Sequence, residues 1–411
     1  MKNLLSVALE CYSRGNLPQA ELVCQSIIRK NRGNVTKATR LLGMICLSTG
    51  NYRSAVKFLN NQGSENDRFA KLARLHLERS NEMRNLRKTK SLALEQFILI
   101  KAWGYGFWSD IDHVLGQLLV AEISGRTPIV HWGDNSLFQS TTGENAFLNF
   151  FEPVTSYSID DLSSDNYSFF PKKWTSKNLK KNNVNKWGKG ARVAGFFFLE
   201  RNEDVVVSDF HTYLFDLISW IPRGHQLFGE TTQSIYRKLA QKYLIPKPHL
   251  TQQADEFFEK RLSGKTTIAV HIRGSDKVRE SINLAKTNES YFDAVDRLIS
   301  KHPNAQIFLL TDDQNQFQKF TSKFGPLVCA TACRRTSTGK GIHHSADISG
   351  RNLGEEVMLD VLIAAKCDFF VGNGASNVST SILHMKDWPS EKVVLLDRNY
   401  LLQEHFSLHK W

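Results

Sequence analysis

The residues of this chain that are best suited to chemistry stand in three short polar clusters. Residues 271–277 read HIRGSDK, residues 311–313 read TDD and residues 372–376 read GNGAS, and each cluster directly follows an apolar run. A guanidinium such as that of Arg273 can bind two phosphate oxygens at once. Backbone N–H groups that open a helix, as at Gly374–Ser376, attract the same kind of anion. Together these groups suit a reaction in which a diphosphate departs with growing negative charge.

Each of these polar residues also has a structural interpretation. His271 ends an apolar run, where its imidazole can simply satisfy a backbone carbonyl. Arg273 can pair with Asp276 or with another structural carboxylate, and Asp312 and Asp313 can cap the helix directly after them. Because the two aspartates lack a spaced Asp-x-Asp form, we predict a site that works without a metal ion.

Asp360 stands out because its surroundings in the sequence are apolar. Residues 353–367 read LGEEVMLDVLIAAKC, which predicts a helix with this carboxylate inside an apolar stretch. A carboxylate that is buried without a partner is costly. We therefore expect Asp360 to bind the polar edge of a ligand.

The elements that must position these residues alternate regularly between strand and helix. Strands are predicted at 266–273, 306–313, 326–331, 368–372 and 392–397, and helices at 289–302, 315–324, 353–367 and 376–386. This alternation predicts a parallel sheet covered by helices on both faces. Ligands bind at the carboxyl ends of the strands in such sheets, which is where the polar clusters stand.

A second strand–helix–strand unit begins earlier in the chain. Residues 97–101 predict a strand, and residues 127–132 predict the next one. The helix between them has one apolar face and ends at Gly125, a suitable C-cap. That face carries Ile111, Val114, Leu115, Leu118 and Leu119. The region from there to about residue 240 is less regular and predicts loops and helices added to the sheet.

The first ninety residues predict helices that repeat with a shift of 35. Ala8 then falls on Gly43, Cys11 on Cys46, Gly15 on Gly50 and Ala20 on Ala55. Small residues at helix contacts and a period near 34 resemble the tetratricopeptide repeat, and residues 68–94 read as a degenerate third unit. Because each repeat buries its face only against neighbours, we expect this region to dock onto the α/β part of the chain. It is either purely structural or a platform for a protein or peptide.

The composition indicates an anionic partner. The formal net charge is +12, and the densest basic stretch is 171–190, with Trp174 and Trp187 interleaved. This stretch reads either as a solvated insertion loop or as a loop that binds the acceptor or a surface. We find no nucleic-acid-binding motif and predict no nucleic-acid partner.

Features absent from the sequence bear on location and redox state. We see no secretory design at the start and no run of about 18 apolar residues, so we predict a cytoplasmic protein without a transmembrane segment. Six cysteines are spread thinly, which favours reduced thiols. Cys329 and Cys333 have only His343 and His344 nearby, and we expect no zinc site.

Several stretches resemble one known family. VHIRGSDKV, at 270–278, resembles the signature strand and loop of the fucosyltransferase superfamily, in particular α1,6-fucosyltransferases and bacterial nodulation fucosyltransferases. Five further stretches agree in order, namely GYGFWSDIDHVLGQLLVAEISGRTPIV, LLTDD, GKGIHHS, EVMLD and GASNVS. The resemblance covers roughly residues 96–400 and leaves the repeat-like region outside.

The resemblance implies a GT-B fold of two facing Rossmann-like domains. The domains would be the helical region 1–94, an acceptor-side domain at 95–258 and a nucleotide-sugar-binding domain at 259–411. The implied reaction is inverting, metal-independent transfer of fucose from GDP-fucose to a glycan or glycoconjugate, with no cofactor.

The resemblance also assigns roles to residues on the donor side. Arg273 would grip the β-phosphate with help from Ser376, while His271 and Asp360 would recognise the guanosine. The remaining donor-side residues are Asp312, Asp313, Gly104, Tyr105 and Gly106.

This chain departs from the family pattern near the arginine. The relatives carry a second arginine where Gly274 stands here, so charge compensation would fall to Arg273 with Lys277 or Arg279.

The catalytic base is the second departure, because the relatives' glutamate falls one position off. Glu280 is the nearest match, and Asp276 is the alternative. These departures leave two other functions open, namely a GT-B transferase with a different nucleotide-sugar donor and a non-catalytic repeat protein with a degenerate transferase domain.

Overall fold

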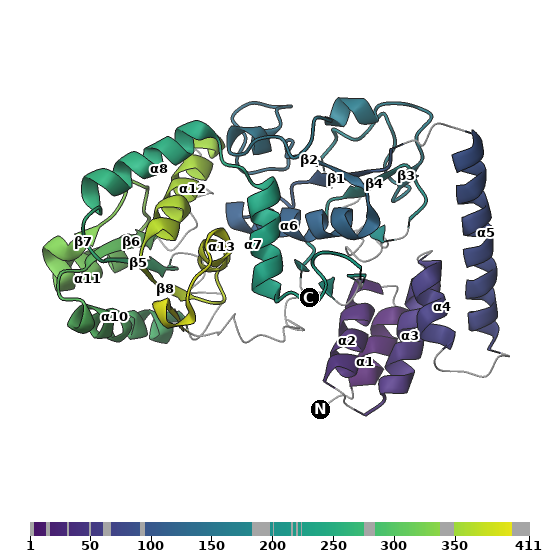
Figure 1. The fold of residues 1–411 in the computed structure, drawn as a ribbon, viewed down its shortest axis with the longest axis horizontal. Helices are drawn as coiled ribbons and strands as arrows, with labels where there is room; N and C mark the ends of the chain where they lie inside the picture. The colour runs from purple at the N-terminus through teal and green to yellow at the C-terminus, as the bar shows by residue number, and fades with distance from the viewer. Residues whose placement is uncertain are drawn as a thin grey trace.

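The computed structural model describes most of the chain. The described ranges are 4–13, 17–30, 33–48, 51–60, 67–90, 95–182, 198–199, 201–214, 217–218, 221–222, 224–274, 284–337 and 349–396. Two α/β lobes lie side by side, and a helical N-terminal region stands next to the first lobe (Figure 1).

The N-terminal region is entirely helical where it is described, as predicted. Its helices are α1 (Leu4–Ser13), α2 (Leu17–Arg29), α3 (Val35–Ser48), α4 (Tyr52–Asn60) and α5 (Arg68–Lys90). A side chain at Gly43 would place its Cβ 2.7 Å from Cγ of Leu59, so the predicted small residue does mark a close contact of α3 with α4. The tetratricopeptide character stays a prediction, and the predicted turn glycines Gly15 and Gly50 lie outside the described residues.

The first lobe contains a parallel sheet in the order β2-β1-β4-β3. Its elements are β1 (Phe97–Lys101), α6 (Phe107–Ser124), β2 (Thr127–His131), β3 (Phe169–Phe170) and β4 (Val205–Ser208). The predicted strands β1 and β2 are confirmed, and so is the C-cap Gly125, whose φ of 69° is left-handed. β3 and β4 arise in the region that we predicted as irregular.

The basic stretch is anchored on this lobe as far as it is described, at Trp174 and Lys173, while Lys172, Lys177, Lys180 and Lys181 are exposed. Trp174 is only 1% exposed. The ammonium of Lys101 lies 4.5 Å from its ring and donates to the carbonyl of Lys181 at 2.9 Å. Lys173 pairs with Asp209 at 2.6 Å, with both side chains buried. Residues 183–190, with Trp187, lie outside the described part.

The second lobe contains the predicted parallel sheet, in the order β7-β6-β5-β8-β9. Its strands are β5 (Thr267–Ile272), β6 (Gln306–Thr311), β7 (Val328–Cys329), β8 (Phe369–Asn373) and β9 (Val393–Leu396). Its helices are α8 (Pro248–Arg261), α10 (Leu284–Lys301), α11 (Gln314–Phe324), α12 (Gly350–Lys366) and α13 (Asn377–Met385). Every strand and helix predicted here is present, although β7 is shorter than expected.

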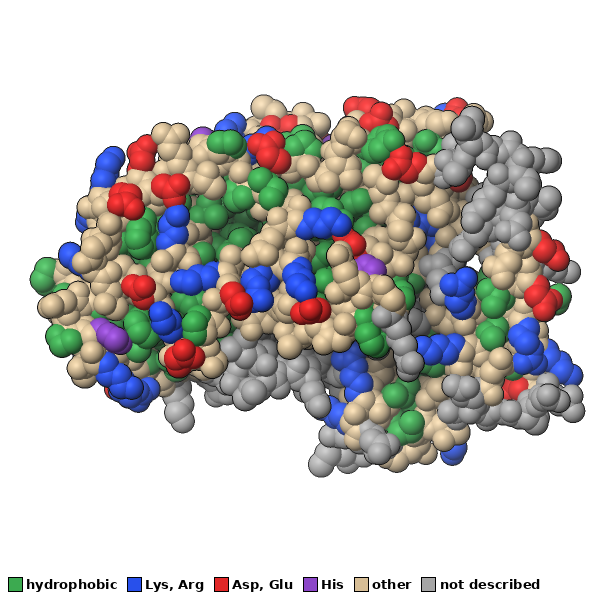
Figure 2. Space-filling model, in the orientation of Figure 1, with side chains coloured by type: hydrophobic (Ala, Val, Ile, Leu, Met, Phe, Trp, Pro, Cys, Tyr) green, Lys and Arg blue, Asp and Glu red, His purple; other side chains and the backbone are tan. Residues whose placement is uncertain are grey.

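The two lobes share one hydrophobic core, which also includes buried residues of α1 to α5. The helix α7 (Thr232–Tyr243) packs against α6 of the first lobe and α13 of the second. A side chain at Gly354 of α12 would come within 2.4 Å of the ring of Phe150 in the first lobe, so the two units approach closely there. Figure 2 shows Lys and Arg side chains spread over the visible face among Asp and Glu. No described helix combines the length and the apolarity needed to cross a membrane.

Candidate functional site

Strand register brings the predicted residues together at one edge of the second sheet. In β5 and β6, Ile272 lies opposite Thr311, and in β5 and β8, Val270 lies opposite Val371. When these registers are continued to the strand ends, Arg273 stands beside Asp312 on one side and near Gly374 on the other. The carboxyl ends of three adjacent parallel strands thus converge, as the alternation of elements predicted.

Arg273 and Asp312 form an ion pair at this edge. Nη1 of Arg273 lies 2.9 Å from Oδ2 of Asp312, and the two side chains are 24% and 20% exposed. The second carboxylate oxygen accepts the backbone N–H of Gly274 at 3.1 Å. Asn288 of α10 donates to the carbonyl of Arg273 at 3.1 Å, which fixes the backbone on the other side. The guanidinium is therefore oriented and still accessible.

Asp313 has a different role from its neighbour. Its carboxylate accepts the N–H groups of Asn315 and Gln316 at 2.8 and 3.2 Å and so caps α11. A Cβ at Gly274 would lie 2.3 Å from Cβ of Asp313. A side chain at position 274 would therefore collide with the cap.

His271 is buried, and its imidazole is held by a serine of α13. Nδ1 lies 2.7 Å from the hydroxyl of Ser379, which also accepts the N–H of Asn373. Tyr291 donates to the carbonyl of His271 at 2.7 Å. Burial lowers the pKa of His271 to about 3, and nearby Arg273 acts in the same direction, so the ring is neutral. It braces the tips of β5 and β8.

Asp360 is buried in α12 and has hydrogen-bond partners within the protein, while the predicted contact with a ligand stays a prediction. Thr331 donates to its Oδ1 at 2.6 Å. Burial raises the pKa of Asp360 to about 6, while hydrogen bonds from Thr331 and Cys333 act against this rise. Cys333 thus has a partner within the protein.

The loop after β8 opens α13 at the same edge of the sheet. Asn373 accepts the N–H of Ala375 at 2.7 Å, which turns the chain into the helix. Ser376 is the N-cap of α13 and makes no capping hydrogen bond with its own side chain. Its hydroxyl is therefore not committed to the helix, and the N–H groups of the first turn carry partial positive charge.

The glycine turn before α6 is organised by a buried carboxylate. Asp110, which is fully buried, accepts the N–H of Gly104 at 3.0 Å and that of Tyr105 at 3.5 Å. Gly104 has a φ of 86°, which favours glycine. Gly106 is the N-cap of α6, and Tyr105 is 42% exposed.

Three predicted catalytic residues, Asp276, Lys277 and Glu280, lie outside the described residues, as do His343 and His344. Within the described part, no group of three or more His, Cys, Asp or Glu side chains is arranged to hold a metal ion.

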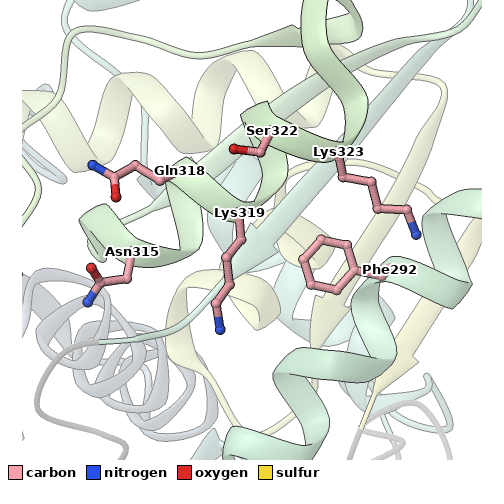
Figure 3. Close-up of a pocket in the computed structure, with 6 residues that line it drawn as sticks. All are labelled: Phe292, Asn315, Gln318, Lys319, Ser322 and Lys323. Carbon is pink, nitrogen blue, oxygen red and sulfur yellow. The ribbon is translucent and has the colours of Figure 1, made fainter.

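A surface hollow of about 860 Å³ lies between α10 and α11 (Figure 3). It is lined by Phe292, Asn315, Gln318, Lys319, Ser322 and Lys323. None of these residues belongs to the strand tips, and we assign the hollow no role in the site.

Sequence reasoning missed a pair of residues at the carboxyl end of the first sheet. Nε2 of His211 lies 3.1 Å from Oδ2 of Asp112, at side-chain exposures of 8% and 17%. The signal was the stretch VVVSDFH, at 205–211, an apolar run with polar residues directly after it.

Comparison with known proteins gives similarities of fold only. No known family model matches the sequence, and no curated protein matches it. The NodZ α-1,6-fucosyltransferase soaked with GDP-fucose is 17% identical, with a TM-score of 0.49 over 71% of this chain and 93% of that chain. NodZ from Bradyrhizobium is 18% identical, with a TM-score of 0.48 over 70% and 91%. POFUT1 in complex with GDP is 14% identical, with a TM-score of 0.46 over 75% and 100%. Fucosyltransferases, the class that the sequence motifs resemble, are thus among the solved structures that this chain is similar to.

Proposed function

We propose that this protein is an inverting, metal-independent glycosyltransferase of GT-B architecture that moves fucose from GDP-fucose to a glycan or glycoconjugate. The observation that carries the proposal is the convergence of Arg273, Asp312 and the start of α13 on three adjacent strand tips. The choice of fucose and of GDP rests on the sequence motifs.

In this proposal, fixed charges do the work of a metal ion. Arg273, oriented by Asp312, binds the β-phosphate, and the first turn of α13 with Ser376 donates hydrogen bonds to the same group. These preorganised donors stabilise the charge that develops on the leaving diphosphate.

The guanosine would bind beside the diphosphate. Asp360 offers a carboxylate to the guanine edge, and the neutral His271 forms the adjoining wall of the site. The glycine turn at Gly104–Gly106 would approach the donor from the first lobe.

The test compares Arg273→Ala with a matched control in the full-length protein. GDP should raise the melting temperature of the wild type, since a ligand that binds only the folded state stabilises it. Arg273→Ala should lose this shift and lower transfer from GDP-fucose by about 100-fold or more. EDTA should have no effect on the wild type.

Arg237→Ala is the control, because Arg237 also pairs with an aspartate, Asp387, at 2.7 Å, but on α7. It should keep both the GDP shift and the transfer rate. Wild-type turnover in Arg273→Ala would end the assignment.

Gly274 motivates the alternative of a different nucleotide-sugar donor. Melting temperatures measured with UDP, CDP and ADP test this alternative, because the nucleotide that belongs to the donor should raise the melting temperature. No shift with any nucleotide at millimolar concentration would favour a non-catalytic repeat protein.

We further propose that α1 to α5 bind a protein partner and that the activity is cytoplasmic.

A further inference from the structure

A histidine and a carboxylate form a fixed pair in the first lobe, outside the second sheet that carries Arg273. Nε2 of His211 lies 3.1 Å from Oδ2 of Asp112. The other oxygen, Oδ1, accepts the hydroxyl of Tyr236 at 2.8 Å. The ring of Tyr236 in turn stacks on that of His384 in α13, with a distance of 4.0 Å between the ring centroids and an angle of 3° between the ring planes. Asp112 is thus held from α7 and, through the ring stack, from the second lobe.

The electrostatics keep Asp112 anionic. Burial acts to raise the pKa of Asp112, but the hydrogen bonds from His211 and Tyr236, together with electrostatic attraction to His211 and His384, hold the pKa below its usual range. A carboxylate next to Nε2 favours a proton on that nitrogen, which leaves the lone pair on Nδ1. Among the described residues, no hydrogen-bond partner is found for Nδ1 of His211. This arrangement of a histidine oriented by a carboxylate is that of a general base.

The pair lies at the edge of the first sheet where ligands bind. His211 follows β4 by three residues, and Trp103 follows β1 by two. The rings of Trp103 and Tyr213 lie 6.0 and 4.3 Å from the imidazole. Tyr105 packs 4.7 Å from Trp103 and is 42% exposed, so this aromatic group reaches the surface. Aromatic faces beside a base suit an acceptor that presents both the apolar face of a sugar ring and a hydroxyl.

We propose that His211, positioned by Asp112, is the general base that activates the hydroxyl of a saccharide acceptor, an inference that rests on the proposed function. Nδ1 takes the hydroxyl proton while the acceptor oxygen forms its bond to C1 of the donor sugar. The bond from C1 to the β-phosphate oxygen breaks, and the nucleoside diphosphate leaves with the electron pair. The imidazolium then returns the proton to water.

The test uses His211→Gln in the full-length protein, with chitin oligomers, galactosides and peptides as acceptor probes. We expect kcat for transfer to fall by about 10² to 10⁴, the usual contribution of a general base. The GDP-induced rise in melting temperature should stay unchanged. His225→Gln is the matched control, because His225 also lies beside a carboxylate, Glu122, at 3.6 Å. It should transfer at the wild-type rate.

Two further variants separate chemistry from structure. His211→Ala should recover part of its activity when imidazole is added, which a purely structural histidine would not. Asp112→Asn should lower kcat at least tenfold, and combined with His211→Gln it should cost no more than His211→Gln alone, because positioning acts only through the base.

The outcomes are distinct. Wild-type transfer by His211→Gln, with GDP binding intact, would overturn this inference and leave the proposed function standing. Loss of the GDP shift in His211→Gln would assign the pair a structural role and also overturn the inference. A wild type that neither binds GDP nor transfers to any probe would overturn both.

Discussion

At the scale of single residues, Asp360 links stability to pH. Its pKa is raised from 3.8 to about 6, chiefly by burial. A raised pKa in the folded state means that the stabilising contribution of the neutral form is complete below about pH 4 and is lost as the pH rises through about 6. Asp360 therefore costs the protein stability at neutral pH.

Asp360→Asn removes this cost, because an amide stays neutral. We expect the free energy of unfolding of the variant, relative to the wild type, to rise between pH 4 and pH 7 by up to about 3 kcal/mol. Urea unfolding at several pH values measures it. Asp387→Asn, at an aspartate whose side chain is 81% exposed, is the control and should follow the wild-type profile. Parallel profiles for Asp360→Asn and the wild type would contradict the pKa assignment.

The separate roles of the neighbours Asp312 and Asp313 could not be predicted from the local sequence. The sequence left a helix cap open for both aspartates, but only Asp313 takes that role, while Asp312 forms an ion pair with Arg273. The choice depends on the strand register that places Arg273 beside Asp312. A pairing between strands 39 residues apart is not encoded in the local sequence.

At the scale of elements, the loop after β5 is constrained by the helix cap next to it. A Cβ at position 274 would overlap the side chain of Asp313, whose backbone bonds to α11 leave it little room to move. Overpacking of this kind costs about 1–3 kcal/mol.

Gly274→Ala should therefore lower the free energy of unfolding by about 1–3 kcal/mol, measured by chemical denaturation. Gly274→Arg, which places a longer side chain at the same position, should be at least as unstable. Gly224→Ala is the control, because no atom lies within 4 Å of a Cβ built there. Its effect should stay within about 0.5 kcal/mol. A stable Gly274→Arg variant would show that steric conflict is not the reason for the glycine.

Helices and strands whose apolar spacing or capping residue is evident in the local sequence could be predicted, and elements without such a pattern could not. The helix α6 and its cap Gly125 follow from apolar spacing and one glycine. β4 consists of four residues between irregular segments, and it is a strand because it pairs with β1 from the far side of a long insertion. Such pairing is set by the whole lobe, so the contact of Asp112 with His211 could not be predicted from local patterns.

At the scale of the whole molecule, the two lobes meet at glycine contacts of α12. A Cβ at Gly354 would lie 2.4 Å from the ring of Phe150 and 3.3 Å from that of Phe107. These rings pack edge to face on one another, and Phe107 packs in the same way on Trp132, so they cannot yield easily. Arg273 and Ser376 belong to the second lobe and the His211 pair to the first, and transfer requires both groups to be correctly placed around the reacting sugar.

Gly354→Val should therefore separate binding from transfer. We expect a lower melting temperature and at least about tenfold slower transfer, because a displacement of about 1 Å between lobes misaligns the reacting groups. The GDP-induced rise in melting temperature should persist, since Arg273 and the start of α13 follow adjacent strands of the same sheet. Asn352→Val, at an exposed position of the same helix, controls for the β-branched side chain and should behave as the wild type. If Gly354→Val lost GDP binding and transfer together, the junction would support the donor site itself and not only its alignment with the acceptor.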